Sequence, residues 1–138
     1  MSERTELNRQ IIEEFRARRG QVGGPYDGIP LLLLTIRGAR TGNEYTRPVM
    51  YLADGDDLVV FGANGGRAAH PGWYHNLMAA GEATVEVGTE LRTVSPRVAT
   101  GTERDRLWAR QLLVFPGLDQ FQTGIDRLIP VVVLQPRD

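Results

Sequence analysis

Short, continuously apolar runs separated by turn residues fill the middle of the chain. Leu31 to Ile36 (LLLLTI) and Asp57 to Gly62 (DLVVFG) have the length and composition of buried strands. Further strands are predicted at 43–53, 83–87, 91–98 and 128–134. Pro48 and Pro96 fall within two of them and indicate edge positions, because proline has no N–H to donate to a neighbouring strand.

Three other segments predict helices. Residues 4–19 place apolar side chains at helical spacing, with Arg and Glu between them. Residues 102–114 show the same spacing, and Pro71 is expected to begin a shorter helix that ends near Ala80. Residues 115–124 (FPGLDQFQTG) are expected to form a loop.

The order of these elements predicts an α+β fold. Strands joined by short turns, with helices at the N-terminus, in the middle and in the C-terminal half, favour a mostly antiparallel sheet curled into a small barrel. We expect one domain over residues 1–138, in which residues 1–20 form a peripheral helix. A Rossmann fold is not expected, because βαβ alternation and the G-x-G-x-x-G motif are absent.

Composition narrows the classes of partner. The net charge is −1, which gives no overall attraction to nucleic acid. No apolar run approaches the roughly 20 residues that span a bilayer. The polar start MSERTELNRQ does not resemble a secretory signal, so a cytoplasmic location is expected. The apolar stripe of the N-terminal helix leaves peripheral contact with a membrane as an alternative.

The chain is poor in side chains that perform chemistry. It has no Cys and no Lys, and all 16 basic residues are Arg. His70 and His75 are five residues apart and do not share a helical face, so we predict no metal site and read both as structural. No catalytic side chain stands out. An enzyme with this composition would depend on a bound cofactor.

Two segments are candidates for cofactor binding. The glycine-rich Gly62 to Gly66 precedes the helix that carries Trp73 and Asn76. Glycines allow close approach of the backbone to a ligand, and a helix start offers unpaired N–H groups. This stretch fits either a cradle for a flat polar ring or a surface loop with a packed Trp.

The second segment is an arginine-rich turn. Arg37, Arg40 and Arg47 surround a turn that contains Thr41 and Gly42. Arginine forks match phosphate and carboxylate groups, although a solvated hairpin tip has the same composition. In a sheet of hairpins this turn and the glycine-rich loop can flank one groove, which would suit an elongated ligand with an anionic tail and a ring.

The ordered motifs LLLLTIRGARTG, RPVMYL, GANGG, HPGWYHNL and IDRLIPVVVLQP are similar to those of the deazaflavin-dependent nitroreductase family of actinobacteria. The resemblance runs from about Leu31 to Pro136. It implies a split β-barrel of the FMN-binding-like type and coenzyme F420 as the cofactor.

The resemblance also implies roles for particular residues. Arg40, Thr41 and Gly42 match the turn that holds the phosphate and polyglutamyl tail of the cofactor. The family often has Arg where this chain has Ala39 and Tyr45, and we expect Arg37 and Arg47 to compensate. The positions that match the family's deazaflavin-binding segments are Pro48, Met50, Ala63, Asn64, Gly65, Gly66, Trp73 and Asn76.

Phe115, Leu118 and Phe121 match the places where nitroimidazole-reducing members carry tyrosines. They lack a hydroxyl group, so we expect hydride transfer from reduced F420 to a small quinone or activated enone rather than to a nitroimidazole. An FMN-dependent reductase on the same barrel and a non-catalytic protein that binds deazaflavin or a lipid-like ligand are the alternatives. Both a monomer and a homodimer are compatible with the sequence.

Overall fold

The computed structural model describes residues 3–137 of the chain. Its strands are β1 (Leu31–Arg37), β2 (Glu44–Met50), β3 (Leu52–Asp54), β4 (Asp57–Phe61), β5 (Ala83–Val87), β6 (Glu90–Val98) and β7 (Val131–Pro136). Its helices are α1 (Glu3–Ala17), η1 (Gly24–Tyr26), η2 (Asn64–Gly66), α2 (Gly72–Ala80), α3 (Gly101–Val114) and α4 (Leu118–Thr123). The strands form one antiparallel sheet in the order β2-β1-β5-β6-β7-β4-β3.

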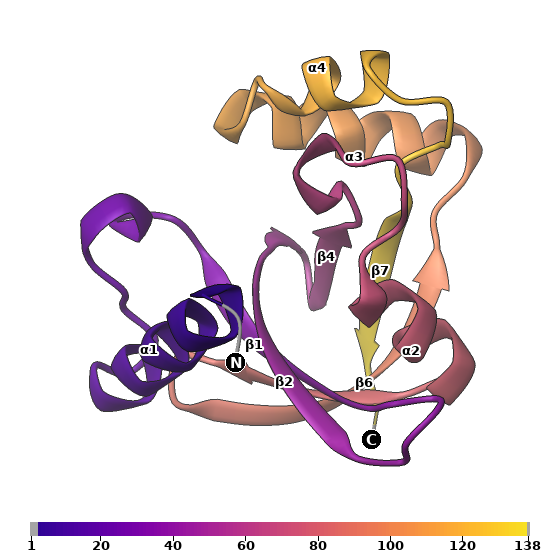
Figure 1. The fold of residues 1–138 in the computed structure, drawn as a ribbon. Helices are drawn as coiled ribbons and strands as arrows, with labels where there is room; N and C mark the ends of the chain where they lie inside the picture. Colours follow the sequence, from indigo (N-terminus) through magenta and orange to yellow (C-terminus); the bar gives the residue numbers. More distant parts are fainter. Residues whose placement is uncertain (1–2, 138) are drawn as a thin grey trace.

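The sheet curls until its two edges approach each other (Figure 1). β2 and β3 are the edge strands, yet Tyr51 alone separates them in the chain. A chain that passes from one edge to the other within one residue requires the sheet to bend back on itself. The Tyr51 N–H donates to the carbonyl of Pro30 at 3.1 Å and fixes this crossing. The predicted α+β fold with a curled antiparallel sheet is therefore confirmed.

Both prolines predicted at edges lie where their strand is paired on one side. Pro48 lies in β2, the edge strand next to β1. Pro96 lies in the second half of β6, where β7 is the only paired strand, because β5 pairs with the first half. β6 thus passes from one partner to the next along its length, which helps the sheet to curl.

Burial on both faces of the sheet explains the continuous apolar runs. Within β1, Leu32, Leu34 and Ile36 face the barrel interior, whereas Leu31 and Leu33 pack with α1 on the outside. A second outer cluster joins α3 to β4 and β7. A strand covered on both faces has no reason to alternate apolar with polar residues.

Helix α1 has most of its apolar face committed to the sheet. Ile11 and Phe15 are buried, and Leu7 is half exposed. The face that would contact a membrane is therefore reduced to Leu7 among the described apolar side chains of this helix. No helix within residues 3–137 is long and apolar enough to cross a bilayer.

Three predicted element boundaries were wrong. The strand predicted over 43–53 is two strands, because the chain changes edges at Tyr51. The closing strand begins at Val131 rather than at residue 128. The predicted loop 115–124 contains α4, whose six residues include one buried apolar side chain, Leu118. One buried position in so short a helix gives no period to recognise.

Candidate functional site

A cavity of about 680 Å³ opens between the β1–β2 turn, the loop after β4 and the start of α2. We call residues 38–43 the Arg turn and residues 62–67 the Gly loop. The lining residues are Ile36, Gly38, Ala39, Arg40, Thr41, Tyr45, Arg47, Asn64, Arg67, Pro71, Gly72, Trp73, His75 and Asn76. The volume falls within the range of small-molecule sites.

The cavity brings both halves of the sequence-predicted site together. The predicted residues that line it are Arg40, Thr41, Arg47, Asn64, Trp73 and Asn76. The remaining ones lie outside its lining: Arg37, Gly42, Pro48, Met50, Ala63, Gly65, Gly66, Phe115, Leu118 and Phe121. The predicted groove between the two segments therefore exists, and contact of each residue with a cofactor stays a prediction.

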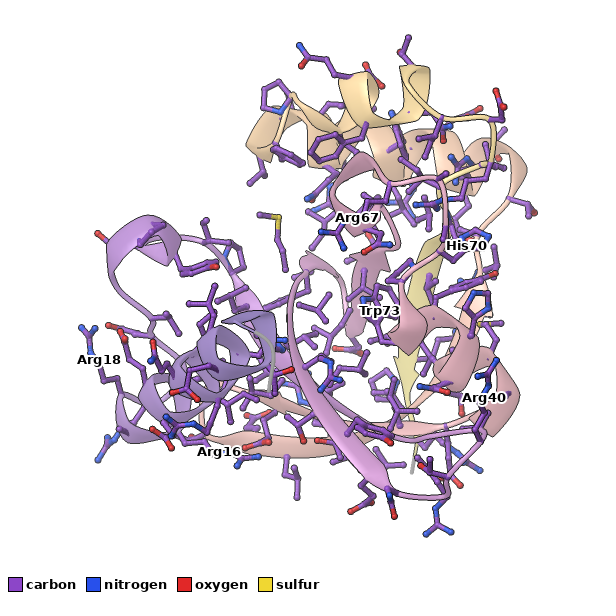
Figure 2. The ribbon with its side chains drawn as sticks, in the orientation of Figure 1. Arg16, Arg18, Arg40, Arg67, His70 and Trp73 are labelled. Carbon is purple, nitrogen blue, oxygen red and sulfur yellow. The ribbon has the colours of Figure 1, made fainter. Side chains whose placement is uncertain are left out.

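The cavity wall is cationic. Arg40, Arg47 and Arg67 line it, and no Asp or Glu within residues 3–137 does. Arg40 and Arg67 are labelled in Figure 2. Among the described residues, Arg40 and Arg67 have no carboxylate within ion-pair distance. The start of α2 adds to this field, because Pro71 provides no side-chain cap for its N–H groups. The arrangement suits an anionic ligand.

The Arg turn is closed by its own hydrogen bonds. The Gly38 N–H donates to the Asn43 carbonyl at 2.7 Å, and the Gly42 N–H donates to the Gly38 carbonyl at 2.9 Å. Gly42 has a φ of 74°, a conformation that favours glycine. The Thr41 hydroxyl accepts from the Asn43 N–H at 3.2 Å and contacts the Tyr45 hydroxyl at 3.0 Å. These bonds define the shape of the turn.

Tyr45 packs its ring against this turn. A Cβ on Gly38 would lie 2.5 Å from Cε2 of Tyr45, so only glycine allows the ring to approach. The Arg47 guanidinium lies over the same ring, 5.6 Å from its centroid. Cation–π contact of this kind orients a guanidinium without neutralising it. Arg47 thus keeps its charge at the cavity wall.

The alternation of β2 separates its candidate residues onto two faces. Tyr45, Arg47 and Val49 pair with the interior-facing residues of β1. Pro48 and Met50 pair with Leu33 and Leu31, which face α1. Met50 packs in that outer cluster, and its sulfur accepts from the buried Gln111 amide at 3.1 Å. Pro48 and Met50 consequently point away from the face that carries Arg47.

Asn76 connects α2 to the Arg turn. Its Oδ1 accepts a hydrogen bond from the Ala39 N–H at 3.0 Å. Helix α2 itself ends at Gly81, whose φ of 74° and bond from its N–H to the Leu77 carbonyl cap the last turn. Trp73, on the same helix, packs partly against the interior cluster while it lines the cavity. Trp73 is thus partly packed and partly exposed to the cavity, and its contact with a ligand stays a prediction.

The Gly loop depends on left-handed backbone. Asn64, Gly65 and Gly66 have φ values of 51°, 63° and 82°. The Asn64 amide donates to the Ala69 carbonyl at 3.0 Å, which stabilises its own unusual conformation. A Cβ on Gly66 would meet Cδ1 of Phe121 at 2.9 Å, whereas one on Gly65 would meet no atom within 4 Å.

Gly65→Ala and Gly66→Ala should therefore differ in stability. Both introduce left-handed strain of about 1 kcal/mol or slightly more. Gly66→Ala adds overpacking against Phe121, which we expect to cost roughly a further 1–3 kcal/mol. Urea unfolding of the two variants measures the difference. Equal free energies of unfolding would show that Phe121 of α4 does not restrict the space at Gly66.

His70 lies beside the Gly loop, in surroundings that disfavour its charged form. Burial lowers the pKa of His70, and the charges of Arg127 and His75 lower it further. Its Nδ1 is 3.0 Å from Nη1 of Arg127, a pair in which arginine must donate. The ring also packs against Tyr74, with centroids 4.7 Å apart. These contacts agree with the predicted structural role of His70.

Acidification should destabilise the protein through His70. Because the folded-state pKa lies below the ordinary histidine value of 6.5, the unfolded chain takes up a proton that the folded chain does not. Stability contributed by this group is present above about pH 6.5 and falls as pH drops toward the folded-state pKa. The midpoint of thermal unfolding should fall less over this window in His70→Gln, which keeps an acceptor for Arg127. Parallel pH profiles would contradict this assignment.

The three predicted acceptor residues have different environments. Phe115 and Phe121 are half-buried, and their rings meet edge to face with centroids 5.5 Å apart. Leu118 is buried at 2% exposure, so its side chain belongs to the packing of α4. Trp108 holds the start of this helix by donating from Nε1 to Asp119 at 2.7 Å.

The polar side chains of the cavity that the sequence did not place in the site include Tyr45, Arg67 and His75. Arg67 directly follows the two glycines of the predicted loop, so its position next to that motif could have identified it. Tyr45 is two residues before Arg47, and the period of a strand places both on one face. For His75 the sequence offers no comparable signal.

Comparison with known proteins agrees with the geometry of this site. The model of a family described as F420H(2)-dependent quinone reductase matches residues 7–136. The chain belongs to this family. An F420H(2)-dependent quinone reductase of Mycobacterium tuberculosis is 33% identical over 129 residues, which cover 89% of this chain and 85% of the relative. The family identifies the protein as an F420-dependent reductase and confirms the predicted cofactor.

Two solved structures share the fold of this chain. A structure of an F420-H2 dependent reductase has a TM-score of 0.70 and 30% identity, and covers 77% of this chain and 94% of its own. A second, described as a domain-swapped dimer, has a TM-score of 0.73 and 27% identity over 96% of this chain and 99% of its own. The split β-barrel predicted from the family resemblance is therefore confirmed.

Proposed function

We propose that this protein binds reduced F420 in the cavity between the Arg turn and the Gly loop and reduces a quinone. The observation that carries the proposal is the cavity wall, where the described lining residues include three arginines and no carboxylate. Membership of the family supplies the cofactor and the class of acceptor. Bound F420H2 would supply the hydride.

The residues present fit the chemistry of this cofactor. Arg40 and Arg67 have no ion-pair partner among the described residues and can take phosphate or carboxylate groups of the tail. Ile36 and Trp73 offer an apolar wall, while Asn64 and Asn76 border it with amide groups. A flat ring could place its apolar faces against the apolar wall and its polar edges against the amide groups.

The chain contributes orientation rather than acid–base chemistry. In the part of the chain that the structure describes, no Asp or Glu lines the cavity, and the exposed His75 is the one imidazole among its lining residues. Reduction of a quinone to the hydroquinone requires one hydride and one proton, and we assign the proton to solvent. Phe115 and Phe121 remain our candidates for an apolar surface beside the acceptor. The buried Leu118 would contribute indirectly, by packing α4 in place.

Oxidation of F420H2 under anaerobic conditions tests the proposal. We expect menadione to accelerate the oxidation at catalytic protein concentrations, with slower turnover of 2-cyclohexenone and little of a nitroimidazole. Enzyme-dependent oxidation that occurs with the enone alone would overturn the quinone assignment. Saturable binding without turnover by any acceptor would favour the non-catalytic alternative.

A further inference from the structure

Arg127 makes the densest set of side-chain contacts around the Gly loop. It follows α4 and precedes β7, about sixty residues along the chain from the loop. Its Nη1 donates to the Gly62 carbonyl at 2.9 Å, and its Nη2 donates to the carbonyls of Ala63 at 2.9 Å and Arg67 at 3.1 Å. Its Nε lies 3.3 Å from the Arg67 carbonyl, and Nη1 also contacts His70.

These contacts span both ends of the Gly loop. The acceptors at Gly62 and Ala63 precede the left-handed residues, and the acceptor at Arg67 follows them. Left-handed glycines lose more conformational freedom on ordering than other residues, so a loop built from them needs external restraint. One planar guanidinium bonded to both ends provides that restraint.

The contacts also set the electrostatics of the loop. The carbonyl groups that accept hydrogen bonds from Arg127 point their oxygens toward its guanidinium. If these oxygens turned toward the cavity instead, they would repel an anionic ligand. Arg127 itself has no carboxylate within ion-pair distance among the described residues, and it is half-buried. Its charge is therefore balanced by backbone dipoles and not by an acid.

We propose that Arg127 is a positioning residue for the cofactor: it holds the Gly loop in the shape that presents Asn64 and Arg67 to the cavity. The inference rests on the proposed cavity as the F420 site. Arg127 does not line the cavity, and it acts through the loop alone. Its substitution should consequently weaken cofactor binding more than it slows turnover at saturating cofactor.

Arg104 provides a matched control. It is also a half-buried arginine that donates to a backbone carbonyl, that of Ile129 at 2.6 Å, and its guanidinium lies over the Trp108 ring. It sits on α3 and does not contact the Gly loop. Arg104→Gln therefore reports the general cost of losing a buried arginine.

Titration of F420 into Arg127→Gln, Arg127→Lys and Arg104→Gln is the test. Arg127→Gln should raise the dissociation constant at least about tenfold, as expected for loss of a charge-assisted hydrogen bond. Arg104→Gln should stay within about twofold of wild type. Arg127→Lys should fall between, since one ammonium cannot reach both ends of the loop as a fork does. At saturating F420H2, the kcat of Arg127→Lys with menadione should change much less than its KM for F420H2.

Amide hydrogen exchange at residues 64–67 gives a readout that needs no cofactor. Exchange should accelerate in both Arg127 variants and not in Arg104→Gln, and if Arg127→Gln does not fold, Arg127→Lys carries the comparison. Unchanged exchange and F420 affinity in the Arg127 variants would overturn the inference. Failure of the wild-type protein to bind F420, with accelerated exchange in these variants, would instead overturn the proposed function and leave Arg127 as the restraint on the loop.

Discussion

Replacement of both Arg40 and Arg67 by Gln should reduce the affinity for F420 by roughly a hundredfold. Each side chain is exposed at the cavity wall without an acidic partner, so each is available for a charge-assisted bond worth about 1.5–3 kcal/mol. About tenfold per residue is the lower end of that range. The dissociation constant from F420 fluorescence measures it, and thermal stability should hardly change because no ion pair is lost.

Arg37→Gln is the control for this experiment. The sequence suggested Arg37 as a residue for the cofactor tail, but it is exposed at the end of β1 and does not line the cavity, so we now expect its removal to leave F420 affinity close to wild type. Its removal changes the net charge by the same amount as either single variant. Equal weakening by Arg37→Gln and Arg40→Gln would show that the protein attracts the ligand by overall charge and not through the cavity wall.

Leu118→Ala should produce the largest loss of stability among the candidate residues. The Leu118 side chain is buried where α4 packs. Its truncation leaves a cavity, which should lower the free energy of unfolding by about 2–5 kcal/mol. Urea unfolding measures the change. Leu113→Ala is the matched control, because Leu113 is 86% exposed and should lose about 0.5 kcal/mol or less.

The same pair of variants separates packing from acceptor binding. If Leu118 contacted the acceptor directly, Leu118→Ala would raise the KM for menadione while leaving the free energy of unfolding close to wild type. We expect the reverse, with a large change in stability. Phe115→Ala and Phe121→Ala then remain the variants that address the acceptor surface.

The sheet was predictable because its apolar runs are long and clearly bounded. LLLLTI, DLVVF and the closing strand are buried on both faces, and Gly and Pro mark the turns between them. The change of edge at Tyr51 was not predictable, because it is set by pairing between distant strands and leaves no local mark. Helix α4 was missed for a related reason, since its single buried side chain shows no period.

The candidate site was predictable as two segments and not as a set of contacts. Motif order placed Arg40 and Asn64 near one groove, and the cavity contains both. The hydrogen bond from Ala39 to Asn76 joins residues that are 37 positions apart. The hydrogen bonds from Arg127 to the Gly loop join residues about sixty positions apart. No pattern in one sequence specifies such partners, because they depend on how the barrel closes.

Titration with F420 and FMN in competition tests the central claim most directly. We expect saturable binding of one F420 per chain, weakened in Arg40→Gln and not in Arg37→Gln, with excess FMN unable to displace it. Preferential binding of FMN, or F420 binding that is insensitive to Arg40, would contradict the assignment of the cavity as the F420 site.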